Sequence, residues 1–500
     1  MSGEVVNLRA LLSCARIINM TNMTTPITLT TTAYPLSSPQ REGWIEQSMC
    51  ADAPPSSQGG YARIDGPIDV ATLERALEHV VEQNDALRLA LVQQDAAPVQ
   101  RIVDRVPVTL ERRDLSGGED AEERAHEWLQ HELERPAPGG EGPLFQFELV
   151  RVAEDRHYWL TRVHPLVADG YAMSLVTQRA AATYNALLSG QPIDEAIRHS
   201  YADFIAHDQA YMASEQFQRD EAYWREKLAT IPEPLLPSRS FGRSAGQPSR
   251  RWRSDLILDR ARFVEMQVFA AEQGTTPFQV ILGALYSYFA RVTQRDDVAF
   301  GLVALNRSTE DFRQTVGKFT STVPAWYQLG TGLSFRELLL ALGQEARRGA
   351  PHRRFPLSEV NRLAGVRGDR PFDVTLSCSG GGCDVRFGDA PASFRFMTAG
   401  CEQKGLRIHV EKLHEQGGAR LRFDGCSENL TKTEIEKLPG RLESLLLEVM
   451  RSPDRALRDL QLLTMAERRQ LGLCVGEAGR DAERGPAVDE QIAHARPLEV

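Results

Sequence analysis

The sequence contains no apolar run near the roughly 20 residues that a helix needs to cross a bilayer. Its start also lacks the pattern of a signal peptide. Glu4 is acidic, and Arg9 and Arg16 interrupt the weakly apolar stretch from Leu8 to Ile18. We therefore expect a cytoplasmic protein without a membrane span.

The chain lacks an excess of positive charge. It has 58 Lys and Arg residues against 68 Asp and Glu residues, for a formal net charge of −10. A general nucleic-acid binder would show a basic stripe, so this class is excluded. A local basic patch is still compatible with an acidic surface. The run His352-Arg353-Arg354 could meet a phosphate or be an ordinary solvated surface.

No C-x-x-C pair is present among the seven cysteines, which are scattered at positions 14, 50, 378, 383, 401, 426 and 474. Cys378 and Cys383 flank three glycines, which allows two interpretations, a metal loop or free thiols in a reducing cytosol. The scattered, odd number favours free thiols. We expect no structural metal and no tightly bound cofactor.

The length predicts two lobes, because 500 residues with 42% hydrophobic exceed what one core usually supports. Threonine-rich residues 24–32 have no burial pattern, residues 235–250 are rich in Pro, Ser and Gly, and the end of the chain turns polar. No internal repeat is visible. The expected organisation is a disordered leader (1–33), an N-terminal lobe (34–234), a linker (235–250), a C-terminal lobe (251–473) and a tail (474–500).

Apolar periodicity predicts helices and strands in both halves. Alternation in Phe145–Val152 and apolar residues in Tyr158–His164, joined by a short polar turn, predict a hairpin-like pair of strands. Further strands are expected over residues 297–305, 372–378, 406–413 and 420–424. Helices are expected over residues 70–84, 119–134, 171–188, 200–228, 261–273, 278–293, 335–348 and 432–450. This mixture predicts the α/β class.

The segment from His164 to Gly170 is the most informative local feature. A strand ends at His164, a short apolar turn follows, and Asp169 is placed to cap the next helix. Such a junction exposes side chains and backbone N–H groups where ligands often bind. Taken alone, the segment favours a hydrogen-bonded structural histidine and a capping aspartate over a ligand site, because side chains of this kind usually bind the local backbone.

This segment resembles the His-His-x-x-x-Asp-Gly signature of condensation domains of nonribosomal peptide synthetases. The resemblance extends over about residues 34–473, because other motifs of that family occur in the same order. These motifs are Tyr34–Trp44, Asn84–Arg88, Tyr201–Phe204, Tyr223–Trp224, Thr315–Pro324, Arg354–Val360, Phe372–Val374 and Leu462–Arg468.

The resemblance implies a fold of two chloramphenicol-acetyltransferase-like lobes, arranged as a V-shaped pseudo-dimer with the His164–Gly170 turn facing the cleft. It implies an acyltransferase that forms an amide from a thioester donor and the amine of a carrier-bound amino acid. The expected partners are a peptidyl carrier protein domain with its phosphopantetheine arm, an acyl-CoA or acyl-carrier donor, and an adjoining adenylation domain.

Asn306-Arg307-Ser308 and Val316-Gly317 are most similar to starter-type domains, which N-acylate the first amino acid in lipoinitiation. Two alternatives remain beside this assignment. One is a catalytically silent, condensation-like scaffold or carrier-protein-binding platform. The other is a relative that transfers acyl groups to a different nucleophile.

The signature is degenerate in this chain, because Pro165 stands where the family has its second, catalytic histidine. Proline has no ionisable group and no backbone N–H. The candidate catalytic positions that remain are His164, Asp169 and Gly170, whose N–H could stabilise an oxyanion. His164 is a poor substitute base, because neighbouring strand residues face opposite ways.

Two further roles follow from the resemblance. Asp169 is expected to form a structural salt bridge with Arg307 of the other lobe and to hold the lobes in register. Glu402 and Gln403 resemble a substrate-binding loop near the family's active tunnel, although they could equally form a plain turn before the strand at Leu406.

Overall fold

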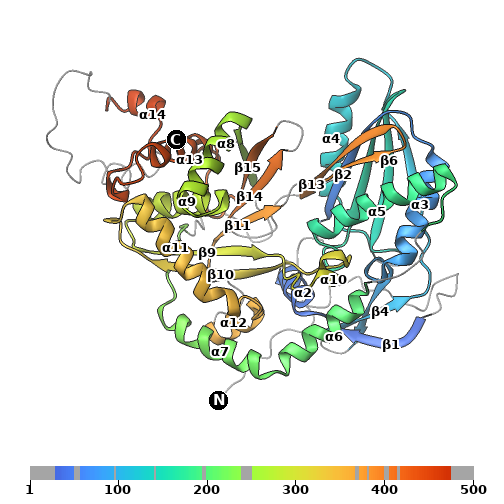
Figure 1. Ribbon diagram of the computed structural model, residues 1–500, viewed down its shortest axis with the longest axis horizontal. Helices are drawn as coiled ribbons and strands as arrows, with labels where there is room; N and C mark the ends of the chain where they lie inside the picture. The colour runs from blue at the N-terminus through green and yellow to red at the C-terminus, as the bar shows by residue number, and fades with distance from the viewer. Residues whose placement is uncertain are drawn as a thin grey trace.

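The computed structural model describes residues 29–49, 57–94, 97–139, 142–193, 199–237, 250–365, 371–379, 382–398, 405–413 and 417–473. The chain folds into two sheet-containing lobes arranged as a V (Figure 1). The prediction of the α/β class with two lobes is confirmed.

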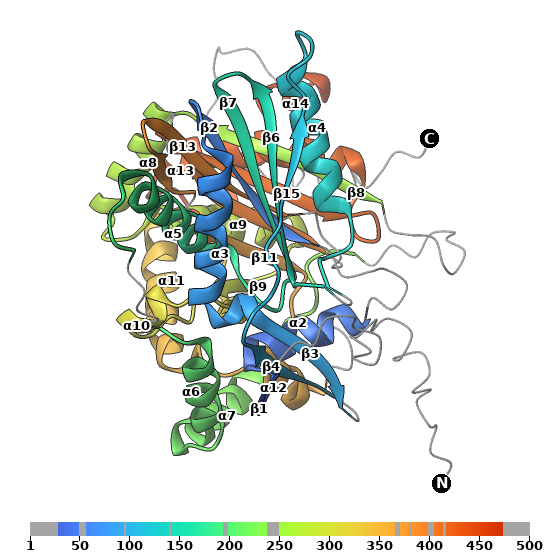
Figure 2. The ribbon, with the colours of Figure 1, turned by 90° about the vertical axis from the view of Figure 1, so that its right-hand side faces the viewer.

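The first lobe is built on a six-stranded sheet in the order β12-β13-β2-β7-β6-β5. Its strands are β2 (Gln58–Asp65), β5 (Leu110–Asp114), β6 (Phe145–Ala153), β7 (Arg156–Val163), β12 (Asp384–Phe387) and β13 (Ala390–Thr398). Helices α3 (Val70–Gln83) and α5 (Gly170–Ser189) cover one face, and α4 (Ala121–Glu134) covers the other (Figure 2).

The local patterns explain these elements. Leu73, Leu77 and Val80 recur at helical spacing and form the buried stripe of α3. Strands β6 and β7 pair antiparallel, so the predicted hairpin is confirmed. The predicted helices at residues 119–134 and 171–188 correspond to α4 and α5, with ends that differ by one or two residues.

The second lobe has another six-stranded sheet, in the order β10-β9-β11-β14-β15-β8. Its strands are β8 (Arg251–Leu258), β9 (Asp297–Ala304), β10 (Ser321–Gln328), β11 (Val374–Ser379), β14 (Leu406–Leu413) and β15 (Gly418–Cys426). Strand β11 runs parallel to both β9 and β14, and the other pairs are antiparallel. The four strands predicted in this half are β9, β11, β14 and β15.

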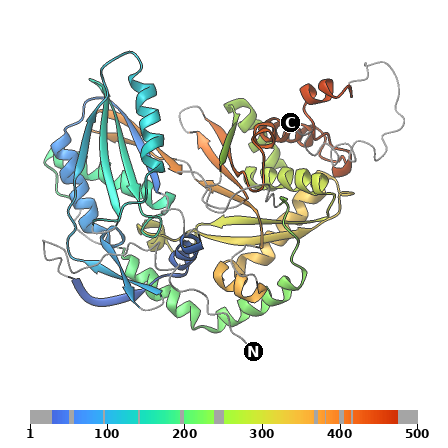
Figure 3. The same ribbon diagram turned by 180° about the vertical axis from the view of Figure 1, so that it is seen from behind.

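Helices cover one face of the second sheet and form the largest apolar core with it. They are α8 (Arg260–Glu272), α9 (Pro277–Thr293), α11 (Phe335–Gly349) and α13 (Lys432–Arg451). All four were predicted. Shorter elements complete this half: α10 (Glu310–Gln314), η4 (Ala350–His352), α12 (Leu357–Ala364), η5 (Leu457–Asp459) and α14 (Met465–Gln470). The opposite face of this sheet is turned toward the first lobe (Figure 3).

Part of the predicted leader is ordered. Residues 29–33 belong to β1 (Leu29–Pro35), which pairs with β4 (Ala97–Val103) in a small sheet completed by β3 (Leu89–Gln94). The expectation of disorder for 29–33 is therefore wrong. β-branched threonines suit a strand when a partner strand supplies hydrogen bonds, and that partner lies about 70 positions away. Helix α2 (Ser38–Met49) and turn η2 (Asp85–Arg88) flank this sheet.

The two lobes are connected along the base of the V. Helices α6 (Tyr201–Met212) and α7 (Glu215–Lys227), followed by η3 (Leu228–Thr230), run beneath both lobes (Figure 1).

The predicted linker begins within the second lobe, because Leu235 and Leu236 are buried in its core and their N–H groups donate to Asp373. Most of that linker and the predicted tail lie outside the described residues.

The sheets do not follow the predicted chain boundary. Strands β12 and β13 come from the second half, yet β13 pairs with β2 and completes the first sheet. The connection between β9 and β10 also reaches into the first lobe, because its apolar core includes Phe312, Val316 and Phe319. The second half therefore supplies two pieces of the first lobe.

Gly60 lies where β2 pairs with β13, so a substitution at Gly60 tests this pairing between the two halves of the chain. A Cβ at Gly60 would lie 2.3 Å from Cζ of Phe394 and 2.7 Å from the carbonyl oxygen of Arg395. We expect Gly60→Ala to lower the free energy of unfolding by about 1–3 kcal/mol, the usual cost of overpacking. Hydrogen exchange should quicken in β13. Gly330→Ala is the matched control, because a Cβ there meets nothing within 4 Å. Equal effects of the two variants would contradict tight pairing at Gly60.

Candidate functional site

The turn from His164 to Gly170 connects β7 to α5 and lies where the two lobes meet. Leu166, Val167 and Ala168 are completely buried and anchor the turn in the first core. Asp169 caps α5, because its Oδ1 accepts a hydrogen bond of 2.9 Å from the N–H of Ala172. Gly170 is therefore the first residue of the helix, and its N–H is among the first-turn donors that have no partner within the helix.

His164 is held inside the turn. Its Nδ1 accepts a hydrogen bond from the N–H of Leu166 at 3.3 Å, and its own N–H donates to the carbonyl of Leu144. Burial lowers the pKa of His164 to about 4, so the ring is neutral at pH 7. An accepting Nδ1 leaves the proton on Nε2. His164 therefore has a structural part in this turn.

Two buried glutamine side chains support the turn through hydrogen bonds. The side-chain amides of Gln40 and Gln100 contact each other at 2.8 Å, and Nε2 of Gln40 also lies 2.8 Å from the carbonyl of Leu166. Both glutamines are fully buried. Sequence reasoning missed this pair, although Gln40 lies inside the Tyr34–Trp44 motif. A buried amide side chain normally has a hydrogen-bond partner.

Asp169 links the lobes through both carboxylate oxygens. Its Oδ1 lies 3.0 Å from Nη2 of Arg307, and its Oδ2 accepts the N–H groups of Phe319 and Thr320 at 3.0 and 3.1 Å. The side chains of Asp169 and Arg307 are each 2% exposed. Burial acts to raise the pKa of Asp169, but the Arg307 guanidinium and backbone donors outweigh it, so the pKa lies below its ordinary value.

Arg307 makes further contacts through Nη1 and through the face of its guanidinium. Its Nη1 donates to the carbonyls of Phe312 and Thr315 at 2.6 and 2.5 Å. Its guanidinium also lies over the rings of Tyr171 and Phe319, at 4.5 and 4.0 Å from their centroids. Hydrogen bonds offset part of the cost of burying an ion pair. Here they reach both carboxylate oxygens of Asp169 and both Nη atoms of Arg307, while Nε of Arg307 has no hydrogen-bond partner among the described residues. The ion pair ties α5 to the connection between β9 and β10.

Tyr201 reinforces the same junction. Its hydroxyl donates to the carbonyl of Lys318 at 2.7 Å and lies 2.9 Å from Oγ of Ser37. Gly317 lets the loop approach the ring, since a Cβ there would lie 2.2 Å from Cδ2 of Tyr201. The glycine at position 317 of the Thr315–Pro324 motif therefore has a steric explanation. Gly317 fits beneath Tyr201, and Phe319 enters the core.

A residue of β13, which the second half of the chain supplies to the first sheet, lies against Gly170. The ring of Phe396 on β13 would lie 3.3 Å from a Cβ at Gly170, and its centroid lies 6.3 Å from the ring of His409 on β14. Burial and the nearby Arg422 and Arg407 lower the pKa of His409 to about 4. A second histidine, which sequence reasoning missed, therefore lies one aromatic ring away from the start of α5.

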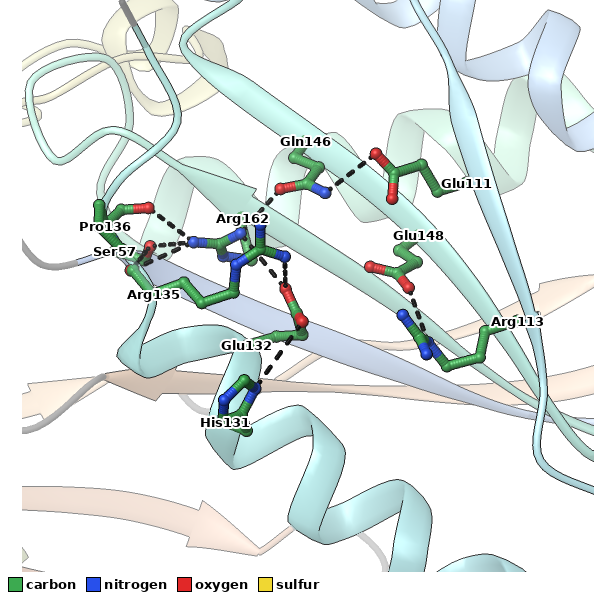
Figure 4. Close-up of polar contacts among 10 residues, drawn as sticks. All are labelled: Ser57, Glu111, Arg113, His131, Glu132, Arg135, Pro136, Gln146, Glu148 and Arg162. Carbon is green, nitrogen blue, oxygen red and sulfur yellow. Dashed lines mark hydrogen bonds and ion pairs between the residues drawn. The ribbon is translucent and has the colours of Figure 1, made fainter.

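A buried charge cluster lies on β7 before the turn (Figure 4). The guanidinium of Arg162 is 3.5 Å from Glu132 and donates to Gln146, to Ser57 and to the carbonyl of Pro136 at 2.7–2.9 Å. Its partners come from α4, β6 and the segments beside them. Because Nη1 and Nη2 of Arg162 are bound to groups of the protein itself, the cluster joins α4 to the sheet.

The remaining predicted residues are placed as follows. Glu402 and Gln403 lie outside the described residues. His352 pairs with the buried Asp220 at 2.7 Å, and Arg354 lies over the ring of Tyr211, so two of the three basic side chains at 352–354 have internal partners. Among the described residues, Cys378, Cys383 and Cys426 are not part of disulfide bonds.

Among the described residues, no helix combines the length and apolar character that a bilayer span requires. Within the same ranges, no three His, Cys, Asp or Glu side chains come together as a candidate metal site.

Comparison with known proteins gives a consistent result. Residues 30–472 match the family model described as "Condensation domain". The chain is 27% identical over 440 residues to isonitrile lipopeptide synthase of Streptomyces coeruleorubidus and 25% identical over 450 residues to surfactin synthase subunit 1 of Bacillus subtilis (strain 168). These matches cover 85% and 88% of this chain, but the chain spans only 29% and 12% of those relatives.

Solved structures share the fold. A mutant of the starter condensation domain of rhizomide synthetase, in complex with C8-CoA, superposes with a TM-score of 0.77 and 27% identity, over 87% of this chain and 98% of that chain. The first condensation domain of the calcium-dependent antibiotic synthetase gives a TM-score of 0.77 and 25% identity, over 87% and 100%. These likenesses confirm the V-shaped arrangement of two chloramphenicol-acetyltransferase-like lobes.

The Asp169–Arg307 pair makes a prediction about stability. Asp169→Ala leaves Arg307 buried without its counter-charge, so we expect the free energy of unfolding in urea to fall by about 3–5 kcal/mol. Specific activity of the folded fraction should fall less than stability does. Asp454→Ala is the control, because Asp454 pairs with Arg336 at the surface and such pairs contribute little. A melting temperature unchanged by Asp169→Ala would contradict the structural role.

The buried His164 makes a prediction about pH. Its pKa is about 4 in the folded chain against an ordinary value of 6.5, so the unfolded chain binds the proton more tightly. Stability from this group is complete above pH 6.5 and falls as the pH drops toward 4, by on the order of 3 kcal/mol. His164→Asn, which keeps an acceptor near Nδ1 but does not titrate, should reduce the slope of unfolding free energy over that window. An identical slope in both proteins would show that His164 is not buried neutral.

Proposed function

The chain belongs to the condensation-domain family of nonribosomal peptide synthetases, and on that premise we propose that it is a starter-type domain, which N-acylates the first amino acid of a lipopeptide. The observation that carries the proposal is the likeness to the starter condensation domain of rhizomide synthetase, whose mutant binds C8-CoA. The similarity to isonitrile lipopeptide synthase points to the same class of product.

The proposed reaction joins an acyl thioester to an amine. The amine nitrogen attacks the thioester carbonyl, the C–N bond forms, the C–S bond breaks, and the thiol leaves. Gly170 contributes its N–H at the start of α5, where the helix dipole and the backbone donor favour a developing oxyanion. Asp169 and Arg307 hold this N–H in place without touching the substrate.

Catalysis in this proposal proceeds with less acid–base assistance than in relatives with both histidines. Pro165 supplies no proton acceptor, and a positioned base typically contributes about 10²–10⁴-fold in rate. His164 cannot replace it, because its Nδ1 is occupied and burial lowers its pKa to about 4. Holding the amine and the thioester together supplies the remaining acceleration.

The proposed partners follow from this chemistry. The acceptor amino acid is held on the phosphopantetheine arm of a peptidyl carrier protein domain, and the donor is an acyl-CoA or an acyl-carrier thioester. An adenylation domain that loads the carrier adjoins this domain. All of them act in the cytoplasm. In this proposal the arms and the acyl group enter between the lobes toward Gly170, and Glu402 and Gln403 contribute to binding there.

A second candidate function is favoured by one observation, the proline at position 165. In this alternative the chain is a catalytically silent scaffold or carrier-binding platform. It would keep the fold through the Asp169–Arg307 pair and would have lost the chemistry together with the second histidine.

An acyl-transfer assay distinguishes the two candidates. Wild-type chain and Pro165→His are incubated with C8-CoA and the acceptor Leu-SNAC, and the N-acylated product is quantified by mass spectrometry. For the starter function we expect measurable product from the wild type. Restoring a base in an intact site should raise the rate of Pro165→His by up to about 10²–10⁴-fold.

The control for this assay is Pro165→Ala, which removes the ring constraint without adding a base. A gain shared by the alanine and histidine variants would assign the effect to the backbone of the turn. Absence of product from the wild type and from both variants, over several acyl donors and a carrier-bound acceptor, would favour the scaffold.

A further inference from the structure

A serine–histidine pair lies on the second sheet, outside the signature turn. Ser377 on β11 and His409 on β14 are direct partners in the parallel register of these strands. The Oγ of Ser377 lies 2.8 Å from Nδ1 of His409 and 3.4 Å from the carbonyl of Ile408. Both residues are half-buried. A hydroxyl in contact with an imidazole nitrogen is the arrangement used to transfer protons or to activate a nucleophile.

The pair lies on the face of the sheet that is turned toward the first lobe. Along β11 and β14, the alternating residues Leu376, Ile408 and Val410 belong to the core of the second lobe. Because strand side chains alternate, Ser377 and His409 point to the other face. Phe396 of the first sheet lies against His409, which places the imidazole where the two sheets approach each other.

This position is next to the site of the proposed reaction. The ring of Phe396 lies close to the Cα of Gly170 at the start of α5, and it also lies beside the ring of His409. A single phenyl ring therefore separates the proposed oxyanion donor from the imidazole. The turn offers no base of its own, since Pro165 cannot titrate and Nδ1 of His164 is occupied.

We propose that Ser377 and His409 form a proton relay that takes the proton of the acceptor amine in place of the missing histidine. As the amine nitrogen bonds to the thioester carbonyl, its proton passes to Oγ of Ser377, and the proton of Ser377 passes to Nδ1 of His409. The imidazolium returns its proton through Ser377 to the departing thiolate. The amide C–N bond forms, the C–S bond breaks, and a thiol is released. The relay rests on the proposed acyl transfer.

The state of the imidazole suits this role in one respect and limits it in another. Burial and the nearby Arg422 and Arg407 lower the pKa of His409 to about 4, so the ring is neutral and can accept a proton at pH 7. A base this weak transfers protons less effectively than one matched to the working pH. The relay should therefore contribute less than a histidine at position 165 would.

The test compares Ser377→Ala with Ser377→Thr in two backgrounds, wild type and Pro165→His. In the wild-type background we expect Ser377→Ala to lower kcat/KM for C8-CoA and Leu-SNAC by about 10-fold or more, and Ser377→Thr to retain most activity. In the Pro165→His background the loss from Ser377→Ala should be small, because another base is present. A merely structural role would give the same loss in both backgrounds. Thr375→Ala, on the same face of β11, is the matched control.

Each other outcome has a definite meaning. Transfer by the wild type with no loss in Ser377→Ala overturns the relay and leaves the starter function intact. Absence of transfer in every background overturns both. An acyl adduct on Ser377, found by intact mass after a single turnover, overturns the relay in favour of a covalent intermediate.

A measurement on the full chain needs no activity. Histidine-labelled NMR should show the His409 ring neutral at pH 7, with Nδ1 unprotonated, and Ser377→Ala should alter its nitrogen shifts. A His409 ring protonated on Nδ1 at pH 7 would overturn the relay.

Discussion

The Asp169–Arg307 ion pair is the contact on which the other features of this site depend. The two charges are buried together, so removing either one would leave the other buried without its counter-charge. The backbone partners of both side chains include groups of the connection between β9 and β10. The pair fixes the start of α5, the loop that carries Gly317 and Phe319, and hence the distance between the two sheets. It persists although position 165 holds proline, which indicates that the architecture of the junction and its acid–base chemistry are separable. A chain can keep the first while changing the second.

Several features could be predicted from the sequence because their signals are local. Helical spacing identified α3, and the polar turn between two apolar stretches identified the β6–β7 hairpin. Asp169 could be recognised as a helix cap from its position alone, and Arg307 could be connected with it only through the family motif. The motif also drew attention to Pro165. In each case the evidence lay within a few residues or in a short pattern that the family shares.

Other features depend on pairing between distant segments, for which the sequence carries no local signal. The threonines near residue 30 form a strand only because β4 is available to them. Nothing in residues 390–398 shows that they complete the sheet of the first lobe rather than that of the second. The Gln40–Gln100 and Ser377–His409 contacts likewise join residues 60 and 32 positions apart. The contact between Ser377 and His409 is set by the register of two strands, and a slip of one residue would turn its side chains to the opposite face. The contact of Gln40 depends on how helix α2 packs against β4.

The exchange of strands between the halves has a consequence for synthesis of the protein. The first core contains Phe319 and Phe394, which leave the ribosome long after β2, β6 and β7. During translation, the edge of β2 remains unpaired, and the apolar face beside it remains exposed, until more than 200 further residues have been made. Exposed edges of this kind invite wrong pairing. The first lobe is therefore exposed to wrong pairing until the second half is made, and a cut between the two halves of the chain would remove β12, β13 and Phe319 from the first lobe.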